Sequence, residues 1–192
     1  MAKKSQEAKK KLIIVHGWEG HPEEGWYPWL KKEMEKRGWE VQVPAMLNTN
    51  DPKIFEWLPF LQQTVGKVDG DTFLVGHSLG CITILRFLEN LQEVKLIGGA
   101  ILIAGFDNPL KYKKLKNFFE EPIAWEKIKT KCKKFVSIHS TDDPDVPIEN
   151  SSSFKKNLGA KTIVTSGFRH FSGEDGITSL PIVLEELLKI SK

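Results

Sequence analysis

The sequence has few cysteines and no long apolar run. These two absences limit the classes of protein to which the chain can belong. Only two cysteines, Cys81 and Cys132, occur among 192 residues. Two thiols in a chain of this length do not form a disulfide scaffold and are typical of a reducing compartment. No apolar stretch approaches the ~18 residues that a membrane span needs. The charged segment Met1–Lys11 has no apolar region behind it, as a secretory signal would. We therefore expect a cytoplasmic protein with no membrane partner.

An excess of charge of one sign is also lacking. Lysine and arginine total 28 against 25 aspartates and glutamates, a net charge of +3. The surplus is mostly lysine in runs, such as residues 111–116 and 127–134. Proteins that bind nucleic acids carry stronger positive charge with arginine interleaved, so we expect no nucleic-acid partner. Hydrophobic residues at 40% and charged residues at 28% are typical of a globular chain. We expect a monomer.

Six short apolar runs alternate with longer segments of helical periodicity. The expected strands are residues 11–15, 39–43, 71–75, 96–104, 134–139 and 161–165, and the expected helices are residues 26–37, 51–65, 79–91, 148–158 and 177–190. The helix at 51–65 opens with Asp-Pro, which is typical of an N-cap followed by a first-turn proline. Strands separated by helices imply right-handed crossovers, so the pattern predicts an α/β fold. Its six-stranded, mostly parallel, doubly wound sheet carries helices on both faces.

The domain organisation is simple. Residues 1–10 form a basic tail that we expect to be disordered or mobile, and residues 11–192 form one domain. The stretch 105–130 is long for a crossover and carries aromatic residues among lysines. We interpret it as a short helical lid or crossover insertion.

The strongest motif is Gly76-His77-Ser78-Leu79-Gly80, a G-x-S-x-G sequence between an expected strand and an expected helix. This context is that of a nucleophile elbow, whose tight turn lifts the serine hydroxyl above the edge of the sheet. Side chains two residues away on either side would clash in such a turn, and glycine removes them. Ser78 is therefore the expected nucleophile.

A serine hydroxyl needs a base, and the base needs an orienting carboxylate. The chain order for this elbow is serine, then acid, then histidine. His170 is the only one of the five histidines that follows the aspartate-rich segment 142–145, and it lies in the loop after the sixth expected strand. His170 is therefore the expected base.

Three aspartates compete for the role of the acid. Asp142, Asp143 and Asp145 all follow the fifth expected strand, and carboxylates at such a position also serve as N-caps. The Asp-x-Val-Pro spacing favours Asp143, with Asp142 as the alternative.

Acyl transfer also needs two hydrogen-bond donors for the oxyanion. The Leu79 N–H, directly after the nucleophile, is one expected donor. The turn His16-Gly17-Trp18-Glu19-Gly20 follows the first expected strand, and its Trp18 N–H is the expected second donor.

Several stretches together resemble the α/β-hydrolase superfamily, and within it the small single-domain serine hydrolases similar to retinoblastoma-binding protein 9 and the YdeN-like proteins. These stretches are residues 25–30, 57–60, 76–80, 122–129 and 140–144. The resemblance implies a single-domain α/β-hydrolase fold with Ser78, Asp143 and His170 as the triad. The Leu-x-Cys-x-Glu motif tied to retinoblastoma binding is missing from residues 64–69, so that interaction is not expected.

Together these motifs predict a serine carboxylesterase that cleaves small carboxylic esters through an acyl-enzyme. Phe106, Trp125 and Phe168 are the expected substrate-binding residues, because aromatic residues gather near the expected pocket. No cofactor or metal is expected, since no spacing such as C-x-x-C or H-E-x-x-H occurs. Thioester or amide hydrolysis would use the same groups, and a protein-binding module on a hydrolase fold is the alternative from another class.

Overall fold

Strands and helices alternate along the chain as the apolar runs predict. The computed structural model describes residues 9–92 and 95–192, so residues 1–8 of the predicted mobile tail lie outside the described residues. The strands are β1 (Lys11–Val15), β2 (Glu40–Gln42), β3 (Thr72–His77), β4 (Gly99–Ile103), β5 (Phe135–Ser140) and β6 (Lys161–Thr165). The helices are α1 (Tyr27–Glu35), α2 (Ile54–Val65), α3 (Leu79–Glu89), the 3₁₀ helix η1 (Lys113–Phe118), α4 (Trp125–Lys129), α5 (Glu149–Leu158) and α6 (Pro181–Ile190).

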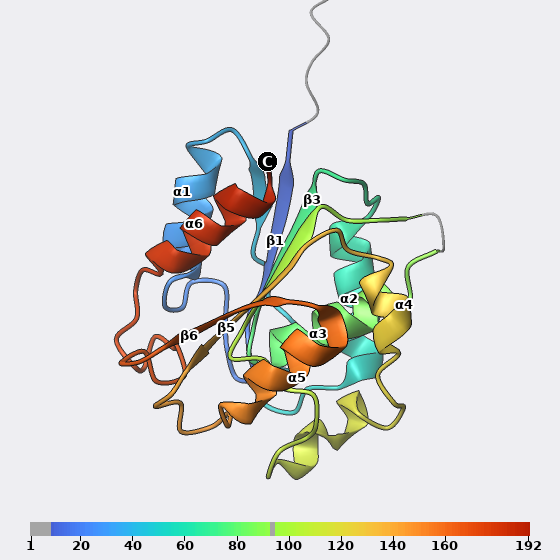
Figure 1. Ribbon diagram of the computed structural model, residues 1–192, viewed down its shortest axis with the longest axis vertical. Helices are drawn as coiled ribbons and strands as arrows, with labels where there is room; N and C mark the ends of the chain where they lie inside the picture. The colour runs from blue at the N-terminus through green and yellow to red at the C-terminus, as the bar shows by residue number, and fades with distance from the viewer. Residues whose placement is uncertain (1–8, 93–94) are drawn as a thin grey trace, which may run out of the picture.

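The six strands form one sheet in the order β2-β1-β3-β4-β5-β6, and every pairing is parallel (Figure 1). This confirms the predicted doubly wound α/β architecture. The chain places β2 on one side of β1 and then crosses over to place β3 on the other side. The loops that leave β1 and β3 therefore turn in opposite directions, and ligands of such sheets bind in the crevice between them.

Helices α1 and α6 cover one face of the sheet, and α2, α3, α4 and α5 cover the other (Figure 1). Trp26 and Leu30 lie in the core of the first face, whereas Trp57, Leu85 and Phe154 lie in the core of the second. Strands β3 and β5 are buried along their whole length because both of their faces are covered. Each large apolar side chain buried in this way contributes about 1.5–3 kcal/mol to folding.

Two predicted helix starts are wrong. The last helix is expected from residue 177, but α6 begins at Pro181, because proline is favoured in the first turn of a helix and disfavours the helical conformation of the residue before it. The second helix also begins later than expected. The Asp-Pro pair predicts that the second helix begins at residue 51, but α2 begins at Ile54 and Lys53 is its N-cap. The reason is a tertiary contact. Asn117, from η1, accepts a hydrogen bond from the Ile54 N–H over 2.7 Å and donates to the Pro52 carbonyl over 3.1 Å. A side chain distant in sequence therefore caps α2.

The insertion at residues 105–130 has two parts. Its 3₁₀ helix η1 lies beyond the carboxyl edge of the sheet, and α4 packs on the face that α5 covers (Figure 1). The Lys114 Nζ also donates to the Asn50 carbonyl over 3.0 Å. The insertion therefore connects the loop before α2 to the edge where the strands end.

Cys81 and Cys132 are both buried and unpaired. No helix in the described ranges has the length and apolar character that crossing a bilayer requires.

Candidate active site

The expected catalytic residues meet at the carboxyl edge of the sheet, where the crossover predicts a crevice. Ser78 follows β3, Asp143 follows β5 and His170 follows β6. The loop with Gly17 and Trp18 follows β1, the neighbour of β3. Parallel strands end at a common edge, which is why residues more than 150 positions apart in sequence, such as Trp18 and His170, lie together.

Ser78 occupies the sharp turn between β3 and α3. Its φ of 53° and ψ of −118° are unusual for a residue with a side chain, and such a conformation costs about 1–3 kcal/mol. The turn is possible because Gly80 lies against β1: a Cβ on Gly80 would lie 2.1 Å from the Val15 carbonyl oxygen. A Cβ on Gly76 would lie 2.9 Å from the backbone N of Cys81. Both predicted glycines of the elbow are therefore required by close backbone contacts.

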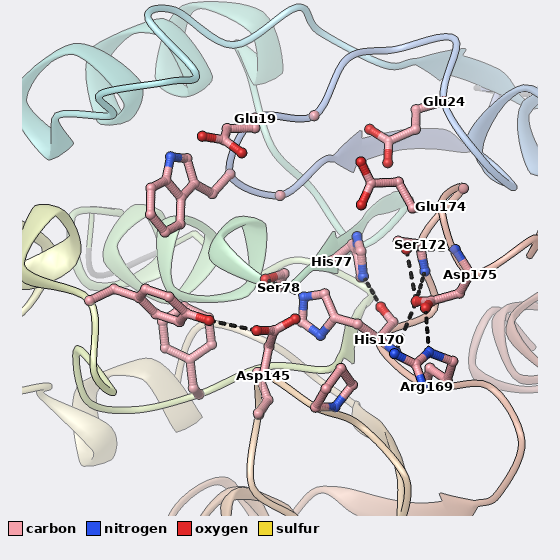
Figure 2. Close-up of a pocket in the computed structure, with 18 of the residues that line it drawn as sticks. Glu19, Glu24, His77, Ser78, Asp145, Arg169, His170, Ser172, Glu174 and Asp175 are labelled. Atoms are coloured by element: carbon pink, nitrogen blue, oxygen red, sulfur yellow. Dashed lines mark hydrogen bonds and ion pairs between the residues drawn. The ribbon is translucent and has the colours of Figure 1, made fainter.

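Three side chains form a continuous hydrogen-bonded row. The Ser78 Oγ lies 2.9 Å from the His170 Nε2, and the His170 Nδ1 lies 2.9 Å from the Asp143 Oδ2. The Asp143 carboxylate accepts only hydrogen bonds when ionised, so the His170 Nδ1 carries a proton and donates. The neutral ring then has a free lone pair on Nε2, which accepts the Ser78 hydroxyl proton. Figure 2 shows the His170 ring turned toward Ser78.

The aspartates of the loop after β5 have different partners. The Asp143 Oδ1 accepts the backbone N–H groups of Asp145 and Val146 over 2.9 and 3.0 Å, which orients its carboxylate toward His170. The Asp142 carboxylate instead accepts the Ser140 hydroxyl and the Gly167 N–H. These hydrogen bonds, led by the Ser140 hydroxyl, lower the pKa of Asp142. Asp142 thus ties two loops together, and Asp143 contacts the histidine.

Asp145 also lines the cavity. Its Oδ1 accepts the Tyr112 hydroxyl over 2.5 Å (Figure 2). Burial, followed by this hydrogen bond, raises the pKa of Tyr112 to about 12. The phenol therefore stays protonated and donates the hydrogen bond to Asp145. The contact fastens the insertion to the loop that carries Asp143.

Backbone donors are available beside Ser78. Within the described ranges, neither the Trp18 N–H nor the Leu79 N–H has a hydrogen-bond acceptor in the protein. His16 holds the turn that carries Trp18: its Nε2 accepts the Met46 N–H over 3.1 Å and its Nδ1 donates to the Gly17 carbonyl over 2.9 Å. Burial lowers the pKa of His16, so the ring remains neutral and can accept and donate in this way.

A cavity of about 780 Å³ opens above Ser78. One part of its wall is apolar, with Phe106, Leu110, Leu115 and Val146. Of the three aromatic residues expected to bind substrate, Phe106 lines the cavity, but Trp125 and Phe168 are not among its lining residues. Trp125 packs against Phe154, and Phe168 stacks on Phe171 with a ring separation of 5.5 Å.

The remaining wall is rich in carboxylates. Figure 2 shows Glu24 and Glu174 on the far side of His77 from Ser78, and Glu19 lies beside the Trp18 turn. Arg169 is the one lysine or arginine among the lining residues, and its Nε donates to the Asp175 Oδ1 over 2.8 Å. The lining residues therefore carry more negative than positive charge, although the chain as a whole carries a net charge of +3. Sequence patterns do not reveal these residues, because they come from two separate loops.

One group of side chains has the composition of a metal site. Ligand atoms of Asp143, Asp145 and His170 lie within 4.8 Å of one another. Asp143 and His170 are hydrogen-bonded to each other, and Asp145 accepts the hydroxyl of Tyr112. Each of these ligand groups thus has a protein partner.

Comparison with known proteins agrees with this geometry. A family model described as serine hydrolase matches residues 12–189. The YdeN protein of Bacillus subtilis, which is named as a hydrolase, is 36% identical over 179 residues, covering 93% of this chain and 94% of YdeN. The serine hydrolase RBBP9 of Rattus norvegicus is 29% identical over 170 residues, covering 86% of this chain and 89% of the relative.

Solved structures extend the likeness to the fold. The crystal structure of the B. subtilis ydeN gene product superposes with a TM-score of 0.91 at 34% identity, covering 95% of this chain and 98% of that one. Est1E from Butyrivibrio proteoclasticus superposes with a TM-score of 0.72 at 17% identity, covering 98% and 90% of the two chains. At that identity the second match shows the fold alone.

Proposed function

This chain belongs to the serine hydrolase family, and from that premise we propose that it is a carboxylesterase that cleaves small carboxylic esters through an acyl-enzyme on Ser78. The observation that carries the proposal is the row of contacts from Ser78 through His170 to Asp143, with both distances at 2.9 Å. A nucleophile, a base and an orienting carboxylate within hydrogen-bond reach are what this chemistry requires.

In the acylation step the Ser78 Oγ attacks the ester carbonyl carbon, and its proton moves to the His170 Nε2. Asp143 holds the ring in the required tautomer and stabilises the positive charge that the ring acquires. When the tetrahedral intermediate collapses, the bond to the alcohol oxygen breaks and the His170 Nε2–H protonates the leaving alcohol. Water then attacks the acyl-enzyme with His170 again as the base, which releases the acid and restores Ser78.

The oxyanion of each intermediate needs donors that are already in place. We assign this role to the Trp18 and Leu79 N–H groups, as expected from the sequence. Their support is that both lack a protein acceptor within the described ranges and that His16 holds the Trp18 turn. Loss of one such donor typically lowers kcat by about 10²–10³-fold.

The cavity supports a small, uncharged substrate. Its apolar wall around Phe106 suits a short acyl chain, whereas carboxylates such as Glu24 and Glu174 repel an anionic leaving group. The insertion provides one short 3₁₀ helix near this wall, which is too little to enclose a long chain.

A panel of esters tests this proposal. We expect kcat/KM to be higher for two-carbon than for sixteen-carbon acyl esters, and higher for neutral esters than for matched esters with a carboxylate on the alcohol. Ser78→Ala should abolish the activity while leaving the melting temperature near that of the wild type. Equal kcat/KM across chain lengths would contradict the substrate assignment. Activity that survives in Ser78→Ala would contradict the mechanism, and no activity in the wild type would favour a binding module.

A further inference from the structure

His77, the residue before the nucleophile, is a buried titratable group that the proposed mechanism does not use. Its side chain makes two short hydrogen bonds. The Nδ1 lies 2.7 Å from the Tyr27 hydroxyl oxygen. The Nε2 lies 2.7 Å from the backbone carbonyl oxygen of His170, a contact that Figure 2 shows. The rings of His77 and His170 are 5.1 Å apart between centroids. His77 thus contacts the proposed base through the backbone of that base.

The partners of His77 determine where its proton lies. A carbonyl oxygen only accepts hydrogen bonds, so the Nε2 of His77 must carry the proton and donate it to His170. Burial is the main cause that lowers the pKa of His77 to about 3, so the His77 ring is neutral at working pH. Its Nδ1 is then a lone-pair acceptor for the Tyr27 hydroxyl. Both nitrogens are satisfied by one tautomer only.

The segment that His77 holds is strained. Arg169 and Phe171, on either side of His170, have φ values of 46° and 58°, which residues with side chains seldom adopt. Such conformations cost about 1–3 kcal/mol each and persist where surrounding contacts determine them. Asp175 accepts the His170 N–H over 3.0 Å, and Trp26 donates to the Phe171 carbonyl over 2.9 Å.

Among these contacts, that of His77 is distinctive because His77 is covalently bonded to Ser78. A closed circuit results: from the Ser78 Oγ to the His170 ring, along His170 to its carbonyl, across to the His77 Nε2, and through one peptide bond back to Ser78. If the loop after β6 moved away from the elbow, the hydrogen bond between the His77 Nε2 and the His170 carbonyl would have to break.

We propose that His77 is a positioning residue that ties the backbone of the base to the nucleophile elbow and so sets the distance between the Ser78 Oγ and the His170 Nε2. The inference rests on the proposed function, in which that distance governs proton transfer. A displacement of about 1 Å in such a pair costs up to roughly 10²-fold in rate. Loss of the bond should therefore lower kcat and leave substrate binding, and hence KM, nearly unchanged.

Two substitutions with the same chemistry but different reach test the proposal. In His77→Gln the side-chain nitrogen takes the place of Nε2 and can still donate to the His170 carbonyl. In His77→Asn the amide takes the place of Nδ1, where Tyr27 can donate to it, but it does not reach His170. We expect His77→Gln to retain kcat within about threefold and His77→Asn to lose at least about tenfold, with KM changed by less than about twofold in both.

Equal kcat in the two variants, whether kept or lost, would overturn the proposal, because only the His77→Gln side chain can donate to the His170 carbonyl. A measurement on the wild-type protein covers the case in which the variants do not fold. Two-bond ¹H–¹⁵N correlation spectra of the histidine rings at pH 7.5 should show His77 as the neutral Nε2–H tautomer. A charged ring, or the Nδ1–H tautomer, would overturn the proposal. The spectrum does not depend on turnover, so an inactive wild-type enzyme would overturn the proposed function and leave the tautomer as a separate test.

Discussion

Adjacent carboxylates in one loop have different tasks. Asp142 accepts hydrogen bonds from Ser140 and from the backbone of the loop after β6, whereas Asp143 contacts the ring of His170. One position along the chain separates a carboxylate that joins two loops from one that touches the proposed base.

Asparagine substitutions separate these tasks. Asp143→Asn should lower kcat by about 10²–10⁴-fold with little change in KM, because the amide no longer fixes the tautomer or the charge of His170. Asp142→Asn retains an oxygen that can accept the Gly167 N–H, so this substitution should lower kcat by about tenfold at most. Steady-state kinetics on both variants, with melting temperatures as the control for folding, measure the difference. A larger loss of kcat in Asp142→Asn than in Asp143→Asn would contradict the proposal that Asp143 is the triad acid.

Much of the residue-level arrangement is predictable from the chain. Chain order selects His170 from five histidines, and the spacing after position 143 favours Asp143; the structure places His170 against Ser78 and Asp143 against His170. The aromatic residues are harder to predict, because composition does not tell which way a ring points. Phe106 lines the cavity, but Trp125 and Phe168 face other side chains.

At the scale of the elements, boundaries depend on contacts that are distant in sequence. The apolar runs of β1 and β6 predict both strands to the residue, since local hydrophobicity determines them. The start of α2 is not predictable in this way, because Asn117, more than 60 positions away, caps it. The junction of β3 and α3 depends likewise on close packing against β1.

Alanine at two glycines separates close packing from backbone preference. A Cβ on Gly80 would overlap the Val15 carbonyl, whereas a Cβ on Gly159, at a φ of 66° after α5, meets nothing within 4 Å. Gly80→Ala should therefore lower the free energy of unfolding by at least ~3 kcal/mol. Gly159→Ala should lower it by about 1 kcal/mol, the cost of a side chain in the left-handed conformation. Urea titration measures both, and equal losses would contradict the packing described for the elbow.

At the scale of the whole molecule, the crossover between β1 and β3 brings the residues of the candidate site together. The same fold buries several histidines and keeps them neutral. Burial is the main cause that lowers the pKa of His77 to about 3 and that of His139 to about 4, and it lowers the pKa of His16 as well. In the unfolded chain these rings titrate near 6.5. Between those limits the unfolded chain therefore binds protons that the folded chain excludes.

Acid should therefore destabilise the fold well before the carboxylates titrate. As the pH falls from about 6.5 to 4.5, the free energy of unfolding should fall by up to about 1.4 kcal/mol per pH unit for His77 and for His139. Asp175, whose pKa is lowered in the folded chain, affects stability only below about pH 4, where protonation of its carboxylate removes its stabilising contribution. His139→Phe keeps an aromatic ring against Phe154 and removes one such titration. Urea unfolding at several pH values should show a shallower pH dependence in this variant, and an unchanged slope would contradict the assignment.

We propose that the fold makes Ser78 the reactive nucleophile of this chain, and covalent labelling measures this reactivity. A fluorophosphonate should form one adduct, which peptide mass spectrometry places on Ser78. His170→Ala should slow labelling by at least ~10³-fold, because the hydroxyl loses its base. The control is a melting temperature showing that the variant is folded. The roles of Ser78 and His170 would be contradicted by labelling at another residue, by no labelling of the wild type, or by undiminished labelling in folded His170→Ala.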